Sequence, residues 1–114
     1  MPIDDVAFGK IVVDGTAYNT DVKIVGGTVI ADWWRRSGHR VEIDDIRDIL
    51  RAAPEVLVIG MGNPGLMKAT VALRRHLENE GIALVQETTD AAAKTFNRLS
   101  AEKRAVAGGF HVGC

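Results

Sequence analysis

The chain has 114 residues, of which 46% are hydrophobic and 25% charged, and its formal net charge is −1. This length is typical of one globular domain over residues 1–114, and the charge balance gives no general attraction to nucleic acid or to an anionic membrane. The only cysteine, Cys114, excludes an intramolecular disulfide and favours a reducing compartment. The opening MPIDDVAFGK lacks the basic and apolar regions of a signal peptide, and no apolar run is long enough to span a bilayer. We therefore expect a cytoplasmic location.

The first third of the sequence predicts an antiparallel β-meander. The apolar segment GKIVV precedes Asp14-Gly15, a dipeptide that favours a type I′ hairpin turn. The segment DVKIV places Val22 and Ile24 on one face of a second strand. After a glycine pair, TVIADWW predicts a further extended stretch over residues 28–34.

Helices and strands alternate over the rest of the chain. The spacing of apolar residues in IDDIRDILRAAP predicts a helix that ends at Pro54. EVLVIG and IALVQE are short apolar runs typical of covered strands, and the helix predicted between them begins near Leu66 and ends at Gly81. A third helix follows, and RAVAGGFHVGC predicts a last strand that Gly108-Gly109 breaks. The pattern therefore predicts an α/β fold with a mixed sheet, one βαβ unit and about three helices.

The stretch VLVIGMGNPG contains the motif G-x-G-x-x-G at Gly60, Gly62 and Gly65. In dinucleotide-binding folds this turn holds a pyrophosphate at a helix N-terminus, and Glu87 has the spacing of a ribose-binding acid. The chain is too short for two mononucleotide-binding halves, however, and a meander precedes the motif. We therefore interpret it as a tight strand-to-helix turn whose free N–H groups offer a niche for a small anion or ligand.

A small-molecule site is expected where the carboxyl ends of the parallel strands meet the helix N-termini. The residues expected to line it are Gly60, Gly62, Asn63, Gly65, Thr88, Thr89 and Asn97. No catalytic residue and no cofactor is expected. His111 and Cys114 would point to opposite faces of a strand, and the histidines and the cysteine lack the spacing of a metal site.

The segment WWRRSGHR gathers aromatic and cationic side chains over residues 33–40. Such a mixture can bind single-stranded nucleic acid, but the run is short and the protein is not basic. One tryptophan in the core, with the arginines solvated or paired with the aspartates of residues 44–48, explains the pattern better. The next alternative is contact with a protein partner, because Trp and Arg are enriched at interface hot spots. That contact would use Trp33, Trp34, Arg35, Arg36 and His39.

Four segments together resemble one family: FGKIVVDGTAYNTDV, WWRRSGH, VLVIGMGNPG and TTDAAAKTFNRLSAEKRAVAGGFHVGC. They are similar to a small single-domain family of unknown function that was first seen structurally in a methanogen. It includes a mitochondrial respiratory complex I assembly factor and an adipogenesis-associated cytosolic protein. The resemblance implies a three-layer α/β fold with an additional β-layer, and it implies no established reaction. Gly108-Gly109, and Phe96 where a tyrosine is usual, depart from the family's pattern.

We therefore expect a non-enzymatic binding or assembly-type module that recognises a protein partner or a small anion. It would be a monomer or a weak homodimer, with no nucleic acid or membrane as partner. The alternative is a nucleotide-dependent oxidoreductase that uses the glycine turn. The two classes differ in one observable, because only an oxidoreductase of this kind would be stabilised by its cofactor.

Overall fold

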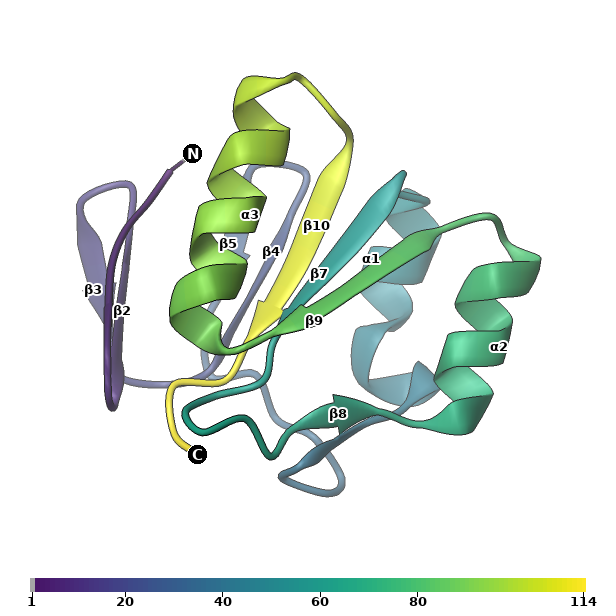
Figure 1. The fold of residues 1–114 in the computed structure, drawn as a ribbon, viewed down its shortest axis with the longest axis horizontal. Helices are drawn as coiled ribbons and strands as arrows, with labels where there is room; N and C mark the ends of the chain where they lie inside the picture. The colour runs from purple at the N-terminus through teal and green to yellow at the C-terminus, as the bar shows by residue number, and fades with distance from the viewer. Residues whose placement is uncertain (1) are drawn as a thin grey trace.

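The structure is a computed structural model that describes residues 2–114, and Figure 1 shows its elements. Its central sheet has five strands in the order β5-β4-β10-β7-β9. These strands are β4 (Val22–Val25), β5 (Thr28–Ile30), β7 (Val56–Gly60), β9 (Ala83–Glu87) and β10 (Val106–Phe110). β10 pairs antiparallel with β4 and parallel with β7, which in turn pairs parallel with β9. The predicted mixed sheet is confirmed.

The N-terminal meander is also confirmed, but it is divided between two sheets. β1 (Ile3–Ala7), β2 (Lys10–Val13) and β3 (Thr16–Tyr18) form a separate antiparallel sheet. Between β2 and β3, Asp14 and Gly15 have φ of 49° and 81°, as a type I′ turn requires. β4 and β5 join the central sheet instead, and the extended stretch expected over 28–34 is shorter because β5 ends at Ile30. The pattern did not predict β1.

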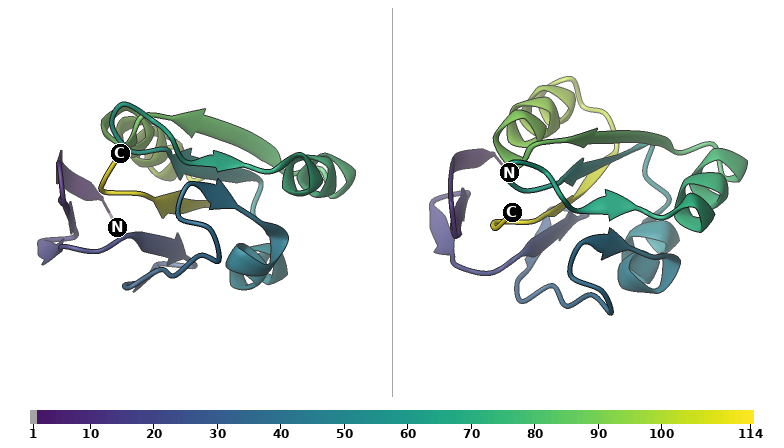
Figure 2. Two further views of the ribbon diagram at one scale, coloured as in Figure 1. Left: turned by 90° about the horizontal axis from the view of Figure 1, so that it is seen from below. Right: turned by 60° about the horizontal axis from the view of Figure 1, so that its bottom comes forward.

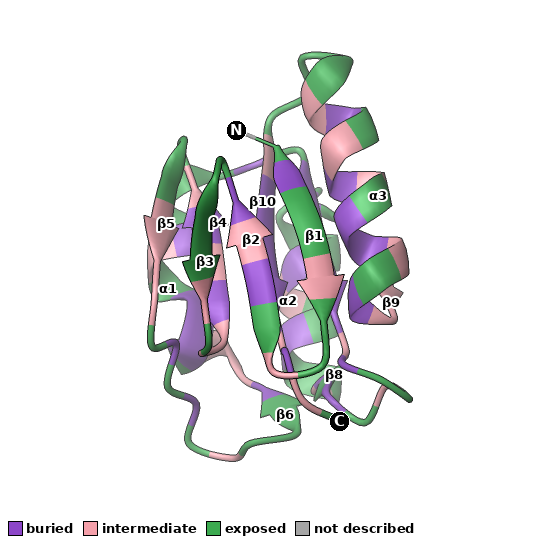
Figure 3. Cartoon of the chain, turned by 90° about the vertical axis from the view of Figure 1, so that its left-hand side faces the viewer, coloured by how far each residue is buried: buried purple, intermediate pink, exposed green. Residues whose placement is uncertain are grey.

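The molecule has three layers, which Figures 2 and 3 show from different sides. The three-stranded sheet and α3 (Thr89–Ala101) cover one face of the central sheet. A 3-10 helix (Ile43–Ile46), α1 (Arg47–Ala52) and α2 (Val71–Asn79) cover the other face. β7 is buried throughout, and its side chains alternate between the two hydrophobic clusters: Val56 and Val58 face α3, whereas Leu57 and Ile59 face the other helices.

β10 continues through Gly108 and Gly109, so the break expected there is absent. A Cβ on Gly108 would collide with the ring of Phe110, which meets Phe96 edge to face with centroids 5.6 Å apart. A Cβ on Gly109 would lie 2.6 Å from the Trp33 ring on the opposite face of the sheet. The two glycines therefore leave room for aromatic rings on both sides of the central strand.

The second helix begins later than the sequence predicts. The chain leaves β7, crosses a loop and forms β8 (Lys68–Ala69), which pairs with β6 (Arg40–Val41), before α2 starts at Val71. Thr70 caps that helix, because its hydroxyl oxygen accepts a hydrogen bond of 3.2 Å from the Leu73 N–H. The glycine motif is therefore not followed directly by a helix N-terminus. No helix within residues 2–114 has the length and apolar character needed to cross a membrane.

Candidate functional site

An ionic cluster of one buried and two partly buried side chains lies at the carboxyl end of the central sheet. Asp21 Oδ2 accepts hydrogen bonds from Arg35 Nη2 at 2.7 Å and from His111 Nδ1 at 2.8 Å, while Oδ1 accepts from the Val112 N–H at 2.8 Å. Burial alone raises the pKa of Asp21, but these hydrogen bonds outweigh it and hold the pKa below its ordinary value. The ionised carboxylate fixes the imidazole, so we call Asp21, Arg35 and His111 the Asp21 cluster.

Arg35 enters this cluster because the WWRR segment is extended and alternates its side chains between core and solvent. The Arg35 side chain is only 4% exposed, and its Nε and Nη2 also donate to the Gly38 carbonyl. Its guanidinium lies 4.5 Å from the centroid of the Trp33 ring, and the Trp33 indole N–H donates to the Asp45 carbonyl at 3.0 Å. Trp33 and Arg35 therefore hold the fold together and are not available on the surface.

His111 has the orientation of a general base but lacks a nucleophile. Within residues 2–114, its Nε2 is buried and has no hydrogen-bond partner, as is also true of Arg35 Nη1. The thiol of Cys114 is exposed and makes no hydrogen bond to the imidazole. The geometry therefore forms no nucleophile–base pair. Residues 2–114 also contain no group of three or more His, Cys, Asp or Glu side chains placed to bind a metal ion.

The N–H groups of the glycine turn are used by the protein itself. The Gly62 N–H donates to the Thr89 hydroxyl at 2.8 Å, and that hydroxyl donates to the His111 carbonyl at 2.6 Å. The Asn63 N–H donates to the Gly113 carbonyl at 3.0 Å, and the Leu66 N–H to the Cys114 carbonyl at 2.8 Å. Residues 111–114 thus occupy donors that a phosphate would need.

The first turn of α3 contains a carboxylate of the protein itself, that of Asp90. The Thr88 hydroxyl and the Ala91 N–H donate to the Asp90 carboxylate and hold the pKa of Asp90 below its ordinary value. A carboxylate in the first turn of a helix compensates the positive end of the helix dipole. The charge that attracts an anion to a helix N-terminus is therefore already partly balanced here.

A small concavity of about 110 Å³ remains between these elements. Its walls are the β1–β2 turn with Phe8, the glycine turn at Gly62 and Asn63, and the start of α3 at Thr89, and residues 111–113 form its floor. It lies at the sheet edge that the sequence predicts. Phe8 and His111 were not among the expected lining residues, because their positions depend on the meander folding back over the end of β10.

The other expected ligand residues have structural contacts. Gly60 is buried in β7, where a Cβ would lie 2.9 Å from the Phe110 ring. The Asn97 side-chain amide donates to the Ile3 carbonyl and accepts from the Ile3 N–H, both at 2.8 Å, which satisfies the free edge of β1. Gly65 and Thr88 do not line the concavity. Glu87, the candidate ribose ligand, accepts a hydrogen bond of 2.6 Å from the Thr95 hydroxyl.

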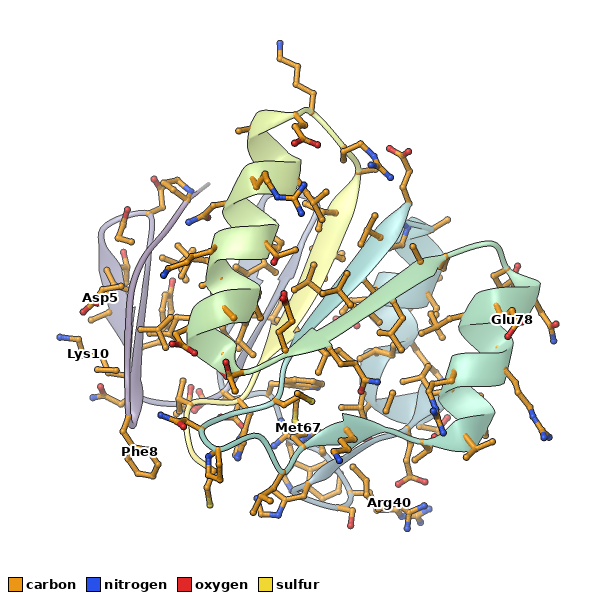
Figure 4. All side chains as sticks on the ribbon, viewed as in Figure 1. Asp5, Phe8, Lys10, Arg40, Met67 and Glu78 are labelled. Atoms are coloured by element: carbon orange, nitrogen blue, oxygen red, sulfur yellow. The ribbon has the colours of Figure 1, made fainter. Side chains whose placement is uncertain are left out.

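Of the residues expected to contact a protein, Trp34, Arg36 and His39 are exposed. Trp34 is 77% exposed, and it lines a separate concavity with Arg36. Three exposed hydrophobic residues were missed: Phe8, 74% exposed, Leu66, 51% exposed, and Val71, 53% exposed, at the start of α2. Figure 4 shows Phe8 at the lower end of the molecule, pointing away from it. The exposure of Phe8 and Leu66 depends on turn geometry and had no signal in the sequence pattern.

Comparison with known proteins supports the architecture. A conserved hypothetical protein from Pyrococcus horikoshii has 22% identity and a TM-score of 0.87, with 100% of both chains covered. An outer membrane protein from Bartonella henselae has 26% identity and a TM-score of 0.79, covering 96% of this chain and 92% of that chain. A Mth938-like domain from Bordetella pertussis has 21% identity and a TM-score of 0.66, covering 98% of this chain and 86% of that chain.

The sequence of the chain also matches one family over almost its whole length. The match extends over residues 3–111, which include the glycine turn, the WWRR segment and α3. The chain therefore belongs to the family of proteins of unknown function DUF498/DUF598.

Proposed function

We propose that the protein is a non-enzymatic binding module that contacts a protein partner through the carboxyl end of its central sheet. The contact surface, called the end surface below, consists of Phe8, His39, Asn63 and Leu66 around the small concavity. The observation that carries the proposal is the exposure of Phe8 and Leu66 beside the same concavity. Phe8 lines the concavity, and the Leu66 N–H bonds to Cys114, next to Gly113 in its floor.

A rigid support favours a role in binding for this end. His39 meets the ring of His111 edge-on with centroids 5.4 Å apart, and the Asp21 cluster fixes His111. Full burial of a phenylalanine or leucine side chain stabilises by about 1.5–3 kcal/mol, which a partner would gain at Phe8 and Leu66. Preorganised aromatic anchors of this kind dominate the energy of many protein interfaces.

The glycine turn gives no comparable support to a nucleotide-dependent oxidoreductase. The N–H groups of Gly62, Asn63 and Leu66 have acceptors within the protein. α2 begins only at Val71, so no helix N-terminus follows the motif. A small ligand in the concavity would instead meet the Asp90 carboxylate, which repels anions. We therefore favour a side chain of a partner protein as the occupant of the concavity.

The resemblance to assembly and regulatory proteins agrees with this proposal. The family that the sequence resembles includes a complex I assembly factor and an adipogenesis-associated protein. Such proteins act by contacting other proteins. A cytoplasmic location and a monomeric or weakly dimeric state are further parts of the proposal.

The test is recovery of a partner from lysate of the source cells, quantified by mass spectrometry. The bait is the wild-type protein, the double variant Phe8→Ser/Leu66→Ser, or the control Val71→Ser, which changes an exposed hydrophobic residue on α2. We expect a protein that wild type and Val71→Ser recover equally and that the double variant recovers about ten-fold less. Equal recovery by all three baits would contradict the end surface as the contact.

The enzyme alternative is tested by thermal unfolding with NAD(P), flavins, nucleotides and phosphate at millimolar concentration. A ligand at one hundred times its Kd stabilises by about 2.7 kcal/mol, which a small domain shows as a clear rise in Tm. We expect no rise. A rise with NAD(P) or a flavin would restore the oxidoreductase hypothesis.

A further inference from the structure

A second surface, remote from the end surface, is a groove between two helical segments. The 3-10 helix with α1 and the separate α2 pack on the same face of the central sheet through Ile46, Ile49, Leu73 and Leu77. Figures 1 and 2 show α1 and α2 as neighbours on that face. An open concavity of about 390 Å³ is lined by Ile43, Arg47, Leu50, Arg51 and His76.

The apolar part of the groove comes from one stripe of the first helical segment. Ile43 of the 3-10 helix and Arg47, Leu50 and Arg51 of α1 all line this side of the groove. Ile43 and Leu50 are half-buried and pack against the core cluster, so each leaves part of its apolar surface toward the groove.

The polar part of the groove is cationic, and no acidic residue lines it. Arg51 has no ion pair within residues 2–114, and Arg47 pairs with Asp44 where both side chains are more than 60% exposed. Exposed pairs of this kind contribute little and exchange readily for another carboxylate. Asp48, the acidic residue of α1, pairs with Lys23 at 2.8 Å. Two of the three cationic side chains thus have an exposed carboxylate beside them, Arg47 with Asp44 and His76 with Glu80 at 3.7 Å, whereas Arg51 has no such partner within residues 2–114.

We propose that this groove docks an acidic amphipathic helix of a partner protein. The apolar side chains of that helix, at spacings of i, i+3, i+4 and i+7, would lie on Ile43 and Leu50. Its Glu or Asp side chains would pair with Arg47 and Arg51, and with His76 when the imidazole is protonated. The residues that line the groove all belong to helical segments and not to a strand edge, so a helix fits it better than an extended peptide.

The proposal is tested by NMR titration of the ¹⁵N-labelled protein with a designed peptide helix. The peptide carries Leu at the four apolar spacings and Glu elsewhere, and a control peptide replaces every Glu by Lys. We expect shifts at the amides of Leu50, Arg51 and His76, with binding of the Glu peptide only. Arg51→Glu should weaken its affinity at least about ten-fold, whereas Arg98→Glu, on the opposite face of the molecule, should not change it.

Three outcomes would overturn the proposal. One is the absence of binding of the Glu peptide at millimolar concentration, and another is binding that Arg51→Glu leaves unchanged. The third is sedimentation of the protein with phosphatidylserine vesicles, lost in Arg51→Glu, without binding of the Glu peptide, which would assign the groove to an anionic membrane. Phe8→Ser/Leu66→Ser leaves the groove intact, so this experiment is independent of the end surface.

Discussion

Two connections lead from parallel strands of the central sheet to a helix, and they differ although their sequences predict the same geometry. β9 ends at Glu87, and α3 starts two residues later at Thr89. β7 ends at Gly60, and α2 starts only at Val71, after a loop and the short strand β8. The connection with the glycine motif is thus the long one.

The difference lies in what the two connections contact. The β9–α3 connection is local, with Thr88 at the N-cap position. The β7–α2 connection is built around residues 111–114, whose carbonyl oxygens accept from Asn63 and Leu66. Gly62 is required because the backbone of Gly113 lies against it, not because a phosphate does. A glycine motif therefore indicates that another group lies close to the backbone, but the sequence alone does not identify that group.

The largest expected loss of stability comes from adding a side chain at Gly62. Gly62 has φ of +94°, and an added Cβ would collide with the Gly113 carbonyl and lie 2.7 Å from the His111 ring. We expect Gly62→Ala to lower the free energy of unfolding by about 4 kcal/mol, from backbone strain and overpacking together. The measurement is urea denaturation at neutral pH.

Gly65→Ala is the matched control for that variant. Gly65 has φ of +114°, but the nearest atoms to an added Cβ are at 3.6 Å, an ordinary contact. Only the backbone strain remains, so we expect a loss of about 2 kcal/mol. Equal losses at the two glycines would show that residues 111–114 do not press against the turn.

The second effect concerns the Asp21 cluster, which anchors residues 111–114. Asp21→Asn removes the charge that Arg35 faces in a buried pair, and we expect a loss of about 3 kcal/mol at neutral pH. Because the pKa of Asp21 is lowered in the folded state, its stabilising contribution is present above the unfolded pKa of about 4 and is lost as the pH falls through the lower folded value.

Urea denaturation of wild type and Asp21→Asn across the acidic range checks this sign. The difference in stability between them should be constant near neutral pH and shrink below about pH 4. Val71→Ser, which alters an exposed hydrophobic residue on α2 and changes no charge, is the control and should show no such convergence. A difference that grows on acidification would mean that Asp21 is not ionised in the folded cluster.

The smallest expected loss of stability concerns the two threonines at the start of α3, Thr88 and Thr89. Thr89→Val leaves the Gly62 N–H and the His111 carbonyl without their shared hydroxyl, and we expect a loss of about 2 kcal/mol. Thr88→Val removes no bond to the backbone of another segment and should cost less. Denaturation of both variants checks the order, and a larger loss at Thr88 would contradict the role of Thr89 as the link between the two connections.

Local patterns predicted the elements but not how separate segments meet. The Asp14-Gly15 turn and the apolar runs of β7 and β9 have strong periodic or turn signals, so their type and order were predicted correctly. Leu66 resembled the first apolar position of a helix, yet a tertiary contact with Cys114 keeps it in the loop. Intrinsic helix propensity is weak compared with tertiary contacts, and the late start of α2 shows that the tertiary contact prevails here.

Less of the candidate site than of the fold could be predicted, for the same reason. Gly62, Asn63 and Thr89 line the concavity because they follow strands of the central sheet, and their role as ligand residues stays a prediction. Asp21 had no signal, since a single aspartate before a strand resembles a turn residue. Its role arises only when Arg35 and His111, distant in sequence, are brought to it.

The most direct test of this account is amide hydrogen exchange at Asn63 and Leu66, followed by NMR. If residues 111–114 occupy the glycine turn, both amides are protected like those of the central strands, and NAD(P) or phosphate at millimolar concentration leaves their shifts unchanged. Fast exchange at both amides, or a shift of either on addition of phosphate, would show instead that the turn is open and that its N–H groups bind an anion.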